Sequence, residues 1–364
     1  KAKQTRYSLV GGCYALRGAG QGKFLARAGE GFASTAGLGS AEGFRMQATD
    51  LGRYLLYGTG EDFLALDSAP LAGDEAVSAN DASNDADWTV NTAGRGFTLT
   101  NKATGRQLAL GGDGVLVTVP DGEGDSFRFR STDGCAVYPE VKVNAKGPVG
   151  TGPQAYGEVS GLVEGHLHHM AFEFLGGRAH CGKPWDRFGA PYALRDCPDH
   201  EVGNGSGAVL ENALYGNPAR SHDPVGWPTF NDWPDPKSLT HEQTYYKWLE
   251  RAWRGGQRVF VKLLVENRVL CDLYPLKQNS CDEMDSVLLQ ARRARQLQDY
   301  IDAQYGGPGK GWYRIVRTPF QARRQINKGN LAVVLGMEVS EPFGCRIQQQ
   351  NTPAESYTCD EAQV

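Results

Sequence analysis

The feature that most constrains the fold is a change in the pattern of apolar residues near residue 150. Before this point, short apolar stretches are interrupted by Gly, Asn and Asp, and no run has a helical period. After it, apolar strands alternate with long amphipathic helices, which is typical of βα units and a parallel sheet. A chain of 364 residues is also long for one core, since domains usually contain roughly 100 to 200 residues. We therefore predict a multidomain protein, all-β first and α/β second.

The boundary between the two predicted domains lies in a segment rich in Gly and Pro. Residues 146–157 read KGPVGTGPQAYG, a composition that favours a linker. We accordingly place the first domain at residues 1–145 and the second at residues 158–364.

Short motifs recur in the first domain. GKFL at 22–25, GRYL at 52–55 and GRQL at 105–108 each lead into a predicted strand, and Phe44, Trp88 and Phe127 mark a second repeated position. These repeats indicate three units, at 7–40, 41–83 and 84–124, each too small to bury its own apolar face. The pattern resembles a β-trefoil of the fascin-like or lectin-like kind, and a small β-sandwich is the alternative.

Four apolar strands and three amphipathic helices alternate in the second domain. The predicted strands cover residues 161–167, 258–265, 312–316 and 331–338. The predicted helices cover residues 240–255, 281–306 and 320–327, and Thr240 with Gln243 has the spacing of a capping box. Four consecutive βα units, less the last helix, make half of an eight-unit TIM-type barrel.

Two histidines at the end of the first predicted strand give the strongest indication of chemistry. In EGHLHH, residues 164–169, the alternation of side chains along a strand places His166 and His168 on one face. Two imidazoles on one face can bind one metal ion, and the C-terminal ends of barrel strands form the catalytic face. Ordinary polar residues at a strand end are the alternative.

A carboxylate ends the fourth predicted strand. Glu338 closes the apolar run LAVVLGME, where an acid needs a cation or a hydrogen-bond network. One carboxylate can bridge two divalent ions that activate a shared water. The alternative is a pair with a nearby Arg. Glu341 is the weaker candidate and is expected on the following loop.

His166, His168 and Glu338 together resemble the metal ligands of the amidohydrolase superfamily of (β/α)-barrel hydrolases. The context Gly336-Met337-Glu338 is similar to the membrane-dipeptidase-like branch, in which a glutamate takes the bridging role. The resemblance covers about residues 158–345. It implies one or two divalent ions, with zinc the first choice, and a catalytic Glu338. This sequence has His168 where that branch has Asp, so peptidase activity does not carry over.

The family also takes two histidines from the fifth and sixth strands and an aspartate from the eighth, and this chain has no such strands. A complete barrel needs roughly 250 residues, more than the 158–364 segment contains. We therefore expect a second polypeptide or a C-terminal fragment to complete the barrel and its metal site.

The connection between the first predicted strand and its helix, residues 169–239, greatly exceeds the roughly two to six residues usual for such loops. Loops of this length are usually functional or disordered. We expect this one to wall a substrate pocket, with His222 and Trp227 as substrate-binding residues. The alternative is that its His and Trp residues pack a small core of the loop itself.

The eight cysteines fall into near neighbours in the sequence, apart from one pair that brackets the first domain. The predicted disulfides are Cys13–Cys135, Cys181–Cys197, Cys271–Cys281 and Cys345–Cys359. No CxxC or CxxxC spacing favours a structural zinc site. Four disulfides are typical of a secreted or periplasmic protein, and buried free thiols in a cytosolic enzyme are the alternative.

Charge and hydropathy argue against two kinds of partner. A net charge of -4, from 38 basic and 42 acidic residues, offers no basic face to a nucleic acid. No stretch approaches the roughly 18 apolar residues of a membrane span. GxSxG elbows and glycine-rich phosphate loops after a strand are also absent from the sequence.

The leading hypothesis is a secreted metal-dependent hydrolase whose metal-bound hydroxide attacks an amide, peptide or ester bond. The trefoil would serve as an accessory domain that binds a carbohydrate or a protein surface. A phosphoesterase on the same barrel is the nearest alternative. A non-catalytic carbohydrate- or protein-binding interaction protein is the second.

Overall fold

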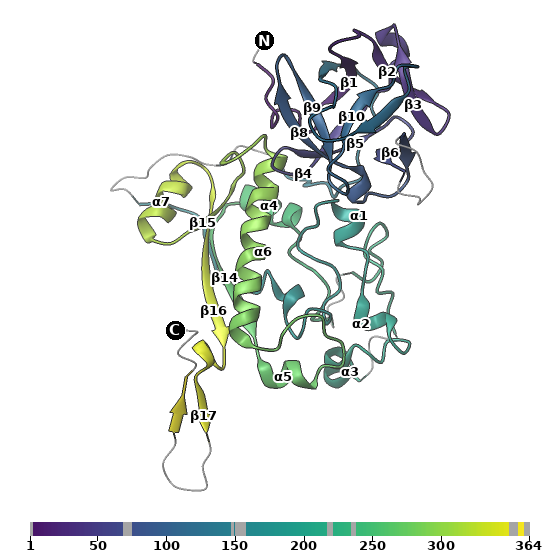
Figure 1. Ribbon diagram of the computed structural model, residues 1–364. Helices are drawn as coiled ribbons and strands as arrows, with labels where there is room; N and C mark the ends of the chain where they lie inside the picture. The colour runs from purple at the N-terminus through teal and green to yellow at the C-terminus, as the bar shows by residue number, and fades with distance from the viewer. Residues whose placement is uncertain are drawn as a thin grey trace. The chain divides into compact units, whose positions relative to one another are not determined.

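The computed structural model divides the chain into two compact units. Unit 1 contains residues 1–139 and 299–311, and unit 2 contains residues 140–298 and 312–364 (Figure 1). The predicted linker lies almost entirely outside the described residues, so the predicted boundary stays a prediction. The structure describes residues 3–67, 75–146, 149, 158–216, 221–233, 238–348 and 356–359.

Unit 1 contains twelve described strands. They are β1 (Cys13–Gly18), β2 (Phe24–Ala28), β3 (Gly31–Thr35), β4 (Phe44–Asp50), β5 (Arg53–Tyr57), β6 (Phe63–Leu66), β7 (Ala76–Ala79), β8 (Asp87–Ala93), β9 (Gly96–Asn101), β10 (Gln107–Leu110), β11 (Leu116–Val119) and β12 (Phe127–Ser131).

The antiparallel pairing of these strands forms a closed ring. β1 pairs with β4, β4 with β5, β5 with β8, β8 with β9, β9 with β12, and β12 returns to β1. The other six strands form three hairpins, β2–β3, β6–β7 and β10–β11. A six-stranded barrel with three hairpins in threefold repetition is the β-trefoil arrangement, which confirms the predicted all-β domain and disfavours the β-sandwich.

The repeated aromatic position has a structural counterpart in each of the three repeats of the trefoil. Phe44, Trp88 and Phe127 lie at the starts of β4, β8 and β12, the fourth strand of each repeat, and all three side chains are fully buried. The repeats therefore run β1–β4, β5–β8 and β9–β12, which shifts the predicted units along the chain.

The glycine motif is not a true repeat. GKFL and GRQL lead into β2 and β10, the second strands of their units, whereas GRYL leads into β5, a first strand. Gly22, Gly52 and Gly105 all have φ between 72° and 75°. Each occupies a turn that needs a left-handed residue, and such turns precede strands at any place in the repeat.

All the strands and helices predicted for the second domain are present, and they lie in unit 2 except for residues 299–304 at the end of α6, which belong to unit 1. The described strands are β13 (Leu162–Leu167), β14 (Gln257–Glu266), β15 (Tyr313–Val316), β16 (Leu331–Val339), β17 (Arg346–Gln348) and β18 (Ser356–Thr358). The described helices are α1 (Ala190–Ala193), α2 (Pro198–Glu201), α3 (Val209–Tyr215), α4 (Tyr246–Arg254), α5 (Arg268–Leu273), α6 (Glu283–Gln304) and α7 (Pro319–Asn327).

Helix α4 begins five residues later than the capping-box spacing predicts, because its N-cap is Tyr245 rather than Thr240. Thr240 does not cap it, because the Thr240 hydroxyl donates a hydrogen bond to Glu211 at 3.2 Å. A side-chain partner from a distant part of the chain has replaced the local backbone partner.

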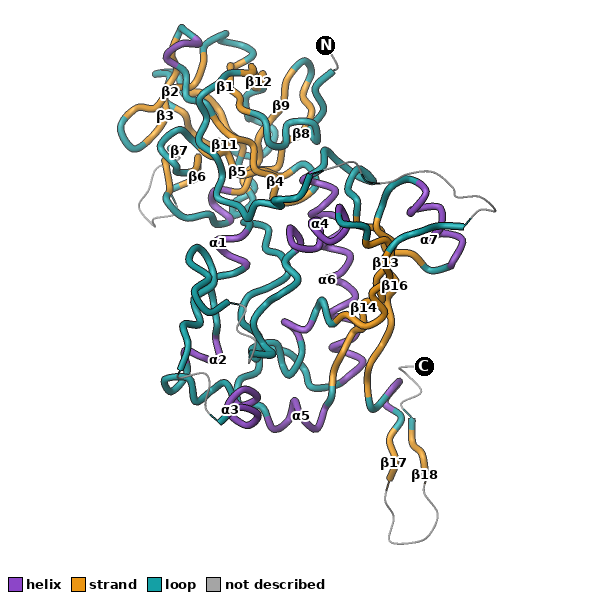
Figure 2. Tube along the Cα trace, turned by 180° about the vertical axis from the view of Figure 1, so that it is seen from behind, coloured by secondary structure: helices purple, strands orange, loops and turns teal. Residues whose placement is uncertain are grey.

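The parallel sheet has the strand order β13-β14-β16-β15. Figure 2 labels β13, β14 and β16 of this sheet. A TIM-type barrel would place consecutive strands side by side, so the third strand would lie beside the second. Here the fourth strand, β16, takes that place and pairs with β14 over eight residues, from Val259↔Ala332 to Glu266↔Val339. The two longest apolar strands have paired, and the described part of the chain does not confirm the predicted barrel.

Helices cover both faces of this sheet. Met284 and Val287 of α6 pack against Leu264 on one face, and Ile326 of α7 packs against Ala332 on the other. Figure 1 shows α6 and α7 on opposite sides of β14 and β16. A barrel keeps its helices on one face of the sheet, so this packing is that of an open α/β sheet.

All four predicted disulfides are present, each within one unit. Such a density of disulfides is typical of an oxidising compartment, and a secreted or periplasmic location stays a prediction. Within the described residues, none of the helices combines the length and apolar character required to cross a bilayer.

Candidate metal centre on the parallel sheet

The register of the sheet determines which face each candidate ligand occupies. Leu167 of β13 pairs with Lys262 of β14, and paired residues point to the same face. His168, which follows Leu167, therefore points to the opposite face. His166 lies where the register of β13 shifts, and its Nε2, 3.0 Å from that of His168, places it on the same side. On β16, Glu338 is an odd number of residues beyond the partner of Lys262, so it points to that opposite face too.

The three predicted ligands meet at the C-terminal ends of β13 and β16. His168 Nε2 lies 2.7 Å from Glu338 Oε2, and His166 Nε2 lies 3.0 Å from the same oxygen. The two Nε2 atoms are 3.0 Å apart. His168 and Glu338 are 170 residues apart in the sequence, so the fold brings them together over a long range. Their role as metal ligands stays a prediction.

This donor set fits a divalent metal ion. Two imidazole nitrogens and a carboxylate oxygen are the ligands that zinc takes in catalytic sites, where a fourth position stays open. The side chains of His166, His168 and Glu338 are 62%, 38% and 44% exposed, so the group is accessible to solvent. The hydrogen bond with His168 lowers the pKa of Glu338, which keeps this carboxylate ionised and able to bind a cation.

The third histidine of the motif lies on the other face. His169 is 1% exposed and packs edge-on against Phe260, with 5.9 Å between ring centroids. Burial lowers the pKa of His169 well below the usual histidine value, and nearby Lys262 adds to that effect. The predicted alternation of His166 and His168 against His169 is confirmed.

The alternative prediction for Glu338 was an ion pair with a nearby arginine, and it is Glu341 that forms such a pair. Its carboxylate oxygens accept hydrogen bonds from the Arg268 guanidinium at 2.6 and 2.8 Å. The ion pairs described for Glu338 are both with histidines. Glu341 is therefore an arginine partner.

The two residues predicted to bind substrate do not belong to this group. His222 packs against His200 and His241, with 5.1 Å between ring centroids in both pairs. Trp227 packs against Phe230 at 6.2 Å. Their role in substrate binding stays a prediction.

The surroundings of His222 contain strongly perturbed groups. Burial lowers the pKa of His241 to about 4. Burial also disfavours the charged form of His200, but hydrogen bonds with Asp199 and Glu211 outweigh it and raise the pKa of His200 to about 9. For Glu211, burial raises the pKa, and hydrogen bonds from His200 and Ser238 outweigh it and lower the pKa to about 2.

Sequence reasoning singled out His222 in the insertion but not Glu211 or His241. A compositional signal was available, because all seven histidines of the chain lie between residues 166 and 241. Histidines concentrated in one part of a chain are an indication of metal binding. The carboxylate had no such signal, since Glu211 is one of many acidic residues.

Comparison with known proteins gives limited likenesses. No family model matches the chain, and no curated protein matches it. Among solved structures, the designed 3-fold symmetric protein ThreeFoil aligns with 16% identity over 33% of this chain and 99% of that protein, with a TM-score of 0.30. SeviL bound to asialo-GM1 saccharide aligns with 16% identity over 34% and 98%, with a TM-score of 0.29.

A salivary protein from Culex quinquefasciatus, of the cysteine- and tryptophan-rich family, aligns with 16% identity over 34% of this chain and 95% of that protein, with a TM-score of 0.29. At these values the likenesses concern about a third of the chain and carry no assignment of activity. The trefoil of unit 1 rests on its own strand pairing.

Proposed function

We propose that unit 2 binds a divalent metal ion through His166, His168 and Glu338 and that this site serves a hydrolase. The observation that carries the proposal is the convergence of three ligand atoms, within 3.0 Å of one another, from strands far apart in the sequence. The site lies at the carboxyl ends of parallel strands, where ligands bind in open α/β sheets. The proposal does not need a closed barrel.

Each residue has a distinct part in this function. His166 and His168 would hold the ion, with zinc the first choice. Glu338 would hold it too, and its ionised carboxylate can accept a proton from a reacting water. A divalent ion bound here would polarise a carbonyl or phosphoryl oxygen and acidify a water. The substrate bond would be an amide, a peptide or an ester, with a phosphoester as the alternative.

A second candidate function is binding through the trefoil. The closed ring of β1, β4, β5, β8, β9 and β12 favours it, because this is the half of the predicted architecture that strand pairing confirms. A trefoil without metal chemistry in unit 2 would make the chain a carbohydrate- or protein-binding protein. Fold alone does not define a ligand, so the two candidates need a direct test.

Metal analysis of the full chain distinguishes the two functions. The His168→Ala variant should lose one equivalent of zinc and any hydrolysis of amide, ester or phosphoester test substrates, with an unchanged far-UV circular dichroism spectrum. His180→Ala is the matched control, because His180 Nδ1 contacts the Gly182 carbonyl oxygen at 3.1 Å and His180 is not in the ligand group. Equal zinc content in His168→Ala and the parent would refute the metal centre.

Glycan-array binding by the full chain tests the second candidate. Binding that persists in His168→Ala, together with no hydrolysis by the parent protein, would favour the interaction protein over the hydrolase. Hydrolysis that disappears in His168→Ala and persists in His180→Ala would favour the enzyme.

A further inference from the structure

The long insertion between β13 and α4 brings together four side chains that the proposed function does not use. His200 lies on α2, Glu211 on α3, and His222 and His241 on the loops that follow. The side chains of His200 and Glu211 are 1% and 0% exposed, and His241 is 1% exposed. One donor atom from each of the four lies within 4.8 Å of the other three.

Two of the distances between these atoms match those of a tetrahedral metal site. His200 Nε2 lies 3.2 Å from Glu211 Oε2, and His222 Nε2 lies 3.4 Å from His241 Nε2. Ligand atoms bound to zinc at about 2.0–2.1 Å in a tetrahedron are about 3.3 Å apart. Two imidazole nitrogens that face each other can share only one proton, whereas a cation between them accepts both lone pairs.

His200 has the outer partner that a metal-bound histidine requires. Its Nδ1 lies 2.7 Å from Asp199 Oδ1, which leaves Nε2 directed at Glu211. The other oxygen of Asp199 accepts a hydrogen bond from the Tyr274 hydroxyl at 3.0 Å. A carboxylate that fixes the ring of a ligating histidine is a regular feature of zinc sites.

Glu211 is oriented in the same way. The hydroxyl of Ser238 donates a short hydrogen bond to Glu211 Oε1, and the Thr240 hydroxyl donates to the same oxygen at 3.2 Å. Its second oxygen, Oε2, is the one that faces His200. Both ligands on α2 and α3 are therefore held in place by other side chains of the insertion.

The charges of the group also favour a cation. Asp199 and Glu211 are both 0% exposed in their side chains, and their described ion pairs are both with His200. Two buried carboxylates thus share one imidazole. His241 Nδ1 is buried without a described hydrogen-bond partner, and Trp233 stacks on this ring at 4.9 Å. A dication bound at the four donor atoms would balance both carboxylates.

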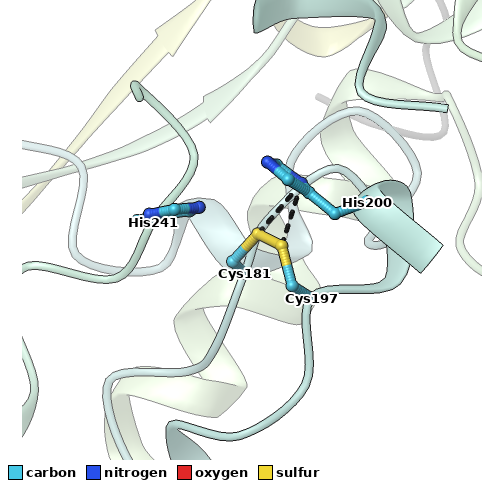
Figure 3. Close-up of side chains that lie close together, drawn as sticks. All are labelled: Cys181, Cys197, His200 and His241. Carbon is cyan, nitrogen blue, oxygen red and sulfur yellow. Dashed lines mark hydrogen bonds between the residues drawn. A yellow bond between two sulfur atoms is a disulfide. The ribbon is translucent and has the colours of Figure 1, made fainter. Parts of the chain in front are cut away.

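A neighbouring disulfide defines which atoms can bind. Figure 3 shows Cys181 and Cys197 joined beside His200 and His241. The sulfur atoms lie 3.5 and 2.9 Å from Nδ1 of His200, the nitrogen that faces Asp199. Disulfide sulfurs are not thiolates, so they do not act as zinc ligands. The donors available in this form are three imidazoles and one carboxylate.

We propose that His200, Glu211, His222 and His241 form a structural zinc site that holds the insertion together. Four protein ligands leave no open position, and closed four-ligand sites are structural. The insertion has only short helices of its own, so a metal that links α2, α3 and two loops would supply much of its order. The proposal is independent of the hydrolase function, since the two donor groups share no residue.

The test uses the full-length chain with the exposed donor group removed. In a His166→Ala/His168→Ala background, we expect one equivalent of zinc after purification and extensive dialysis. Adding Glu211→Gln, which keeps the shape of the side chain, or His222→Ala, whose ring is only half-buried, should abolish it. Adding His180→Ala should leave the full equivalent in place. Zinc retained by both ligand variants, or no zinc in the background protein, would overturn the proposal.

Two further readouts test the site without removing a ligand. Asp199→Asn should weaken zinc affinity by about 10–100-fold while leaving the stoichiometry at one. Cobalt(II) exchanged into the background protein should give the intense visible absorption of a four-coordinate nitrogen and oxygen site. A sulfur-to-cobalt charge-transfer band would instead show Cys181 and Cys197 as ligands and would refute this donor set.

A loss of metal must be distinguished from a loss of fold. The circular dichroism of each ligand variant should equal that of the metal-free background protein, and zinc should raise the thermal midpoint of the background protein alone. A midpoint that rises equally in the Glu211→Gln variant would count against the site.

Discussion

At the scale of single residues, Lys262 occupies an unusual position. It is 0% exposed on the face of the sheet that α6 covers, and its Nζ has no hydrogen-bond partner among the described residues. Its Nζ lies 5.1 Å from the centroid of the Tyr313 ring, a cation–π contact. Burial lowers the pKa of Lys262 well below the usual lysine value, although Glu242 acts in the opposite direction.

Lys262→Met should therefore stabilise unit 2, because methionine fills the same space without a buried amine. We expect a gain of roughly 1–3 kcal/mol in the free energy of unfolding at pH 7, measured by urea denaturation. Lys142→Met, at an exposed position of unit 2, is the matched control and should change little. A destabilised Lys262→Met variant would contradict this account.

The same lysine gives the parent protein a pH dependence of defined sign. The unfolded chain binds a proton at Lys262 up to a pKa of about 10.4, whereas the folded chain releases it at lower pH. Stability should rise with pH between these two pKa values, by up to about 1.4 kcal/mol per pH unit. Denaturation between pH 8 and 10 should show this slope in the parent and a smaller one in Lys262→Met. Equal slopes in the two proteins would show that Lys262 is not the cause of this pH dependence.

Residues were predictable from the sequence where the cause is local. The shared face of His166 and His168 follows from alternation along one strand, and Glu338 from an acid at the end of an apolar run. The concentration of histidines indicated the region of His200, His222 and His241. It did not predict which side chains meet or that Glu211 joins them, because the path of an irregular insertion determines this and no periodic pattern marks that path.

At the scale of elements, amphipathic patterns predicted every strand and helix of the parallel sheet but not their order. Periodicity is a property of one segment, whereas the pairing of β14 with β16 depends on matching lengths and apolar surfaces of distant segments. β15 has four residues and pairs at the edge, and β16 has nine. The order of the strands along the chain therefore predicted β15 beside β14, whereas the longer strand β16 takes that place.

Helix α7, which connects β15 to β16, offers a test at this scale. Thr318 is its N-cap, and its side chain accepts a hydrogen bond from the backbone N–H of Gln321 at 3.2 Å. Thr318→Ala should cost about 1 kcal/mol of unfolding free energy, measured by thermal or urea denaturation. Thr318→Ser keeps the hydroxyl and should retain most of that stability. Equal losses in both variants would show that the cap is not the cause.

At the scale of the whole molecule, the two units are not consecutive pieces of chain. Residues 299–311 belong to unit 1, although residues on both sides of them belong to unit 2. Ala303 is part of the trefoil core, and Gln304 donates a hydrogen bond to the Ala48 carbonyl oxygen at 2.6 Å. A boundary at one linker could not predict that residues 299–311 belong to unit 1. The apolar pattern at the end of a long amphipathic helix does not show which core that end packs against.

The disulfides differ in how much of the molecule they constrain, and this difference predicts unequal losses of stability. Cys13–Cys135 spans the whole trefoil with a separation of 122 residues, and Cys271–Cys281 closes a separation of only 10. Loop-closure entropy gives about 5 kcal/mol for the first and about 3 kcal/mol for the second. Replacing Cys13 and Cys135 by alanines should therefore lower the unfolding free energy of unit 1 more than replacing Cys271 and Cys281 lowers that of unit 2.

Hydrogen exchange measured by mass spectrometry can localise these losses. In Cys13→Ala/Cys135→Ala, peptides from β1 to β12 should lose protection while those from β14 and β16 keep it, because the removed constraint acts on the unfolded ensemble of unit 1 alone. Cys271→Ala/Cys281→Ala should show the reverse, with a smaller effect. Equal loss of protection in both units of either variant would mean that the molecule unfolds as one cooperative body despite its two cores.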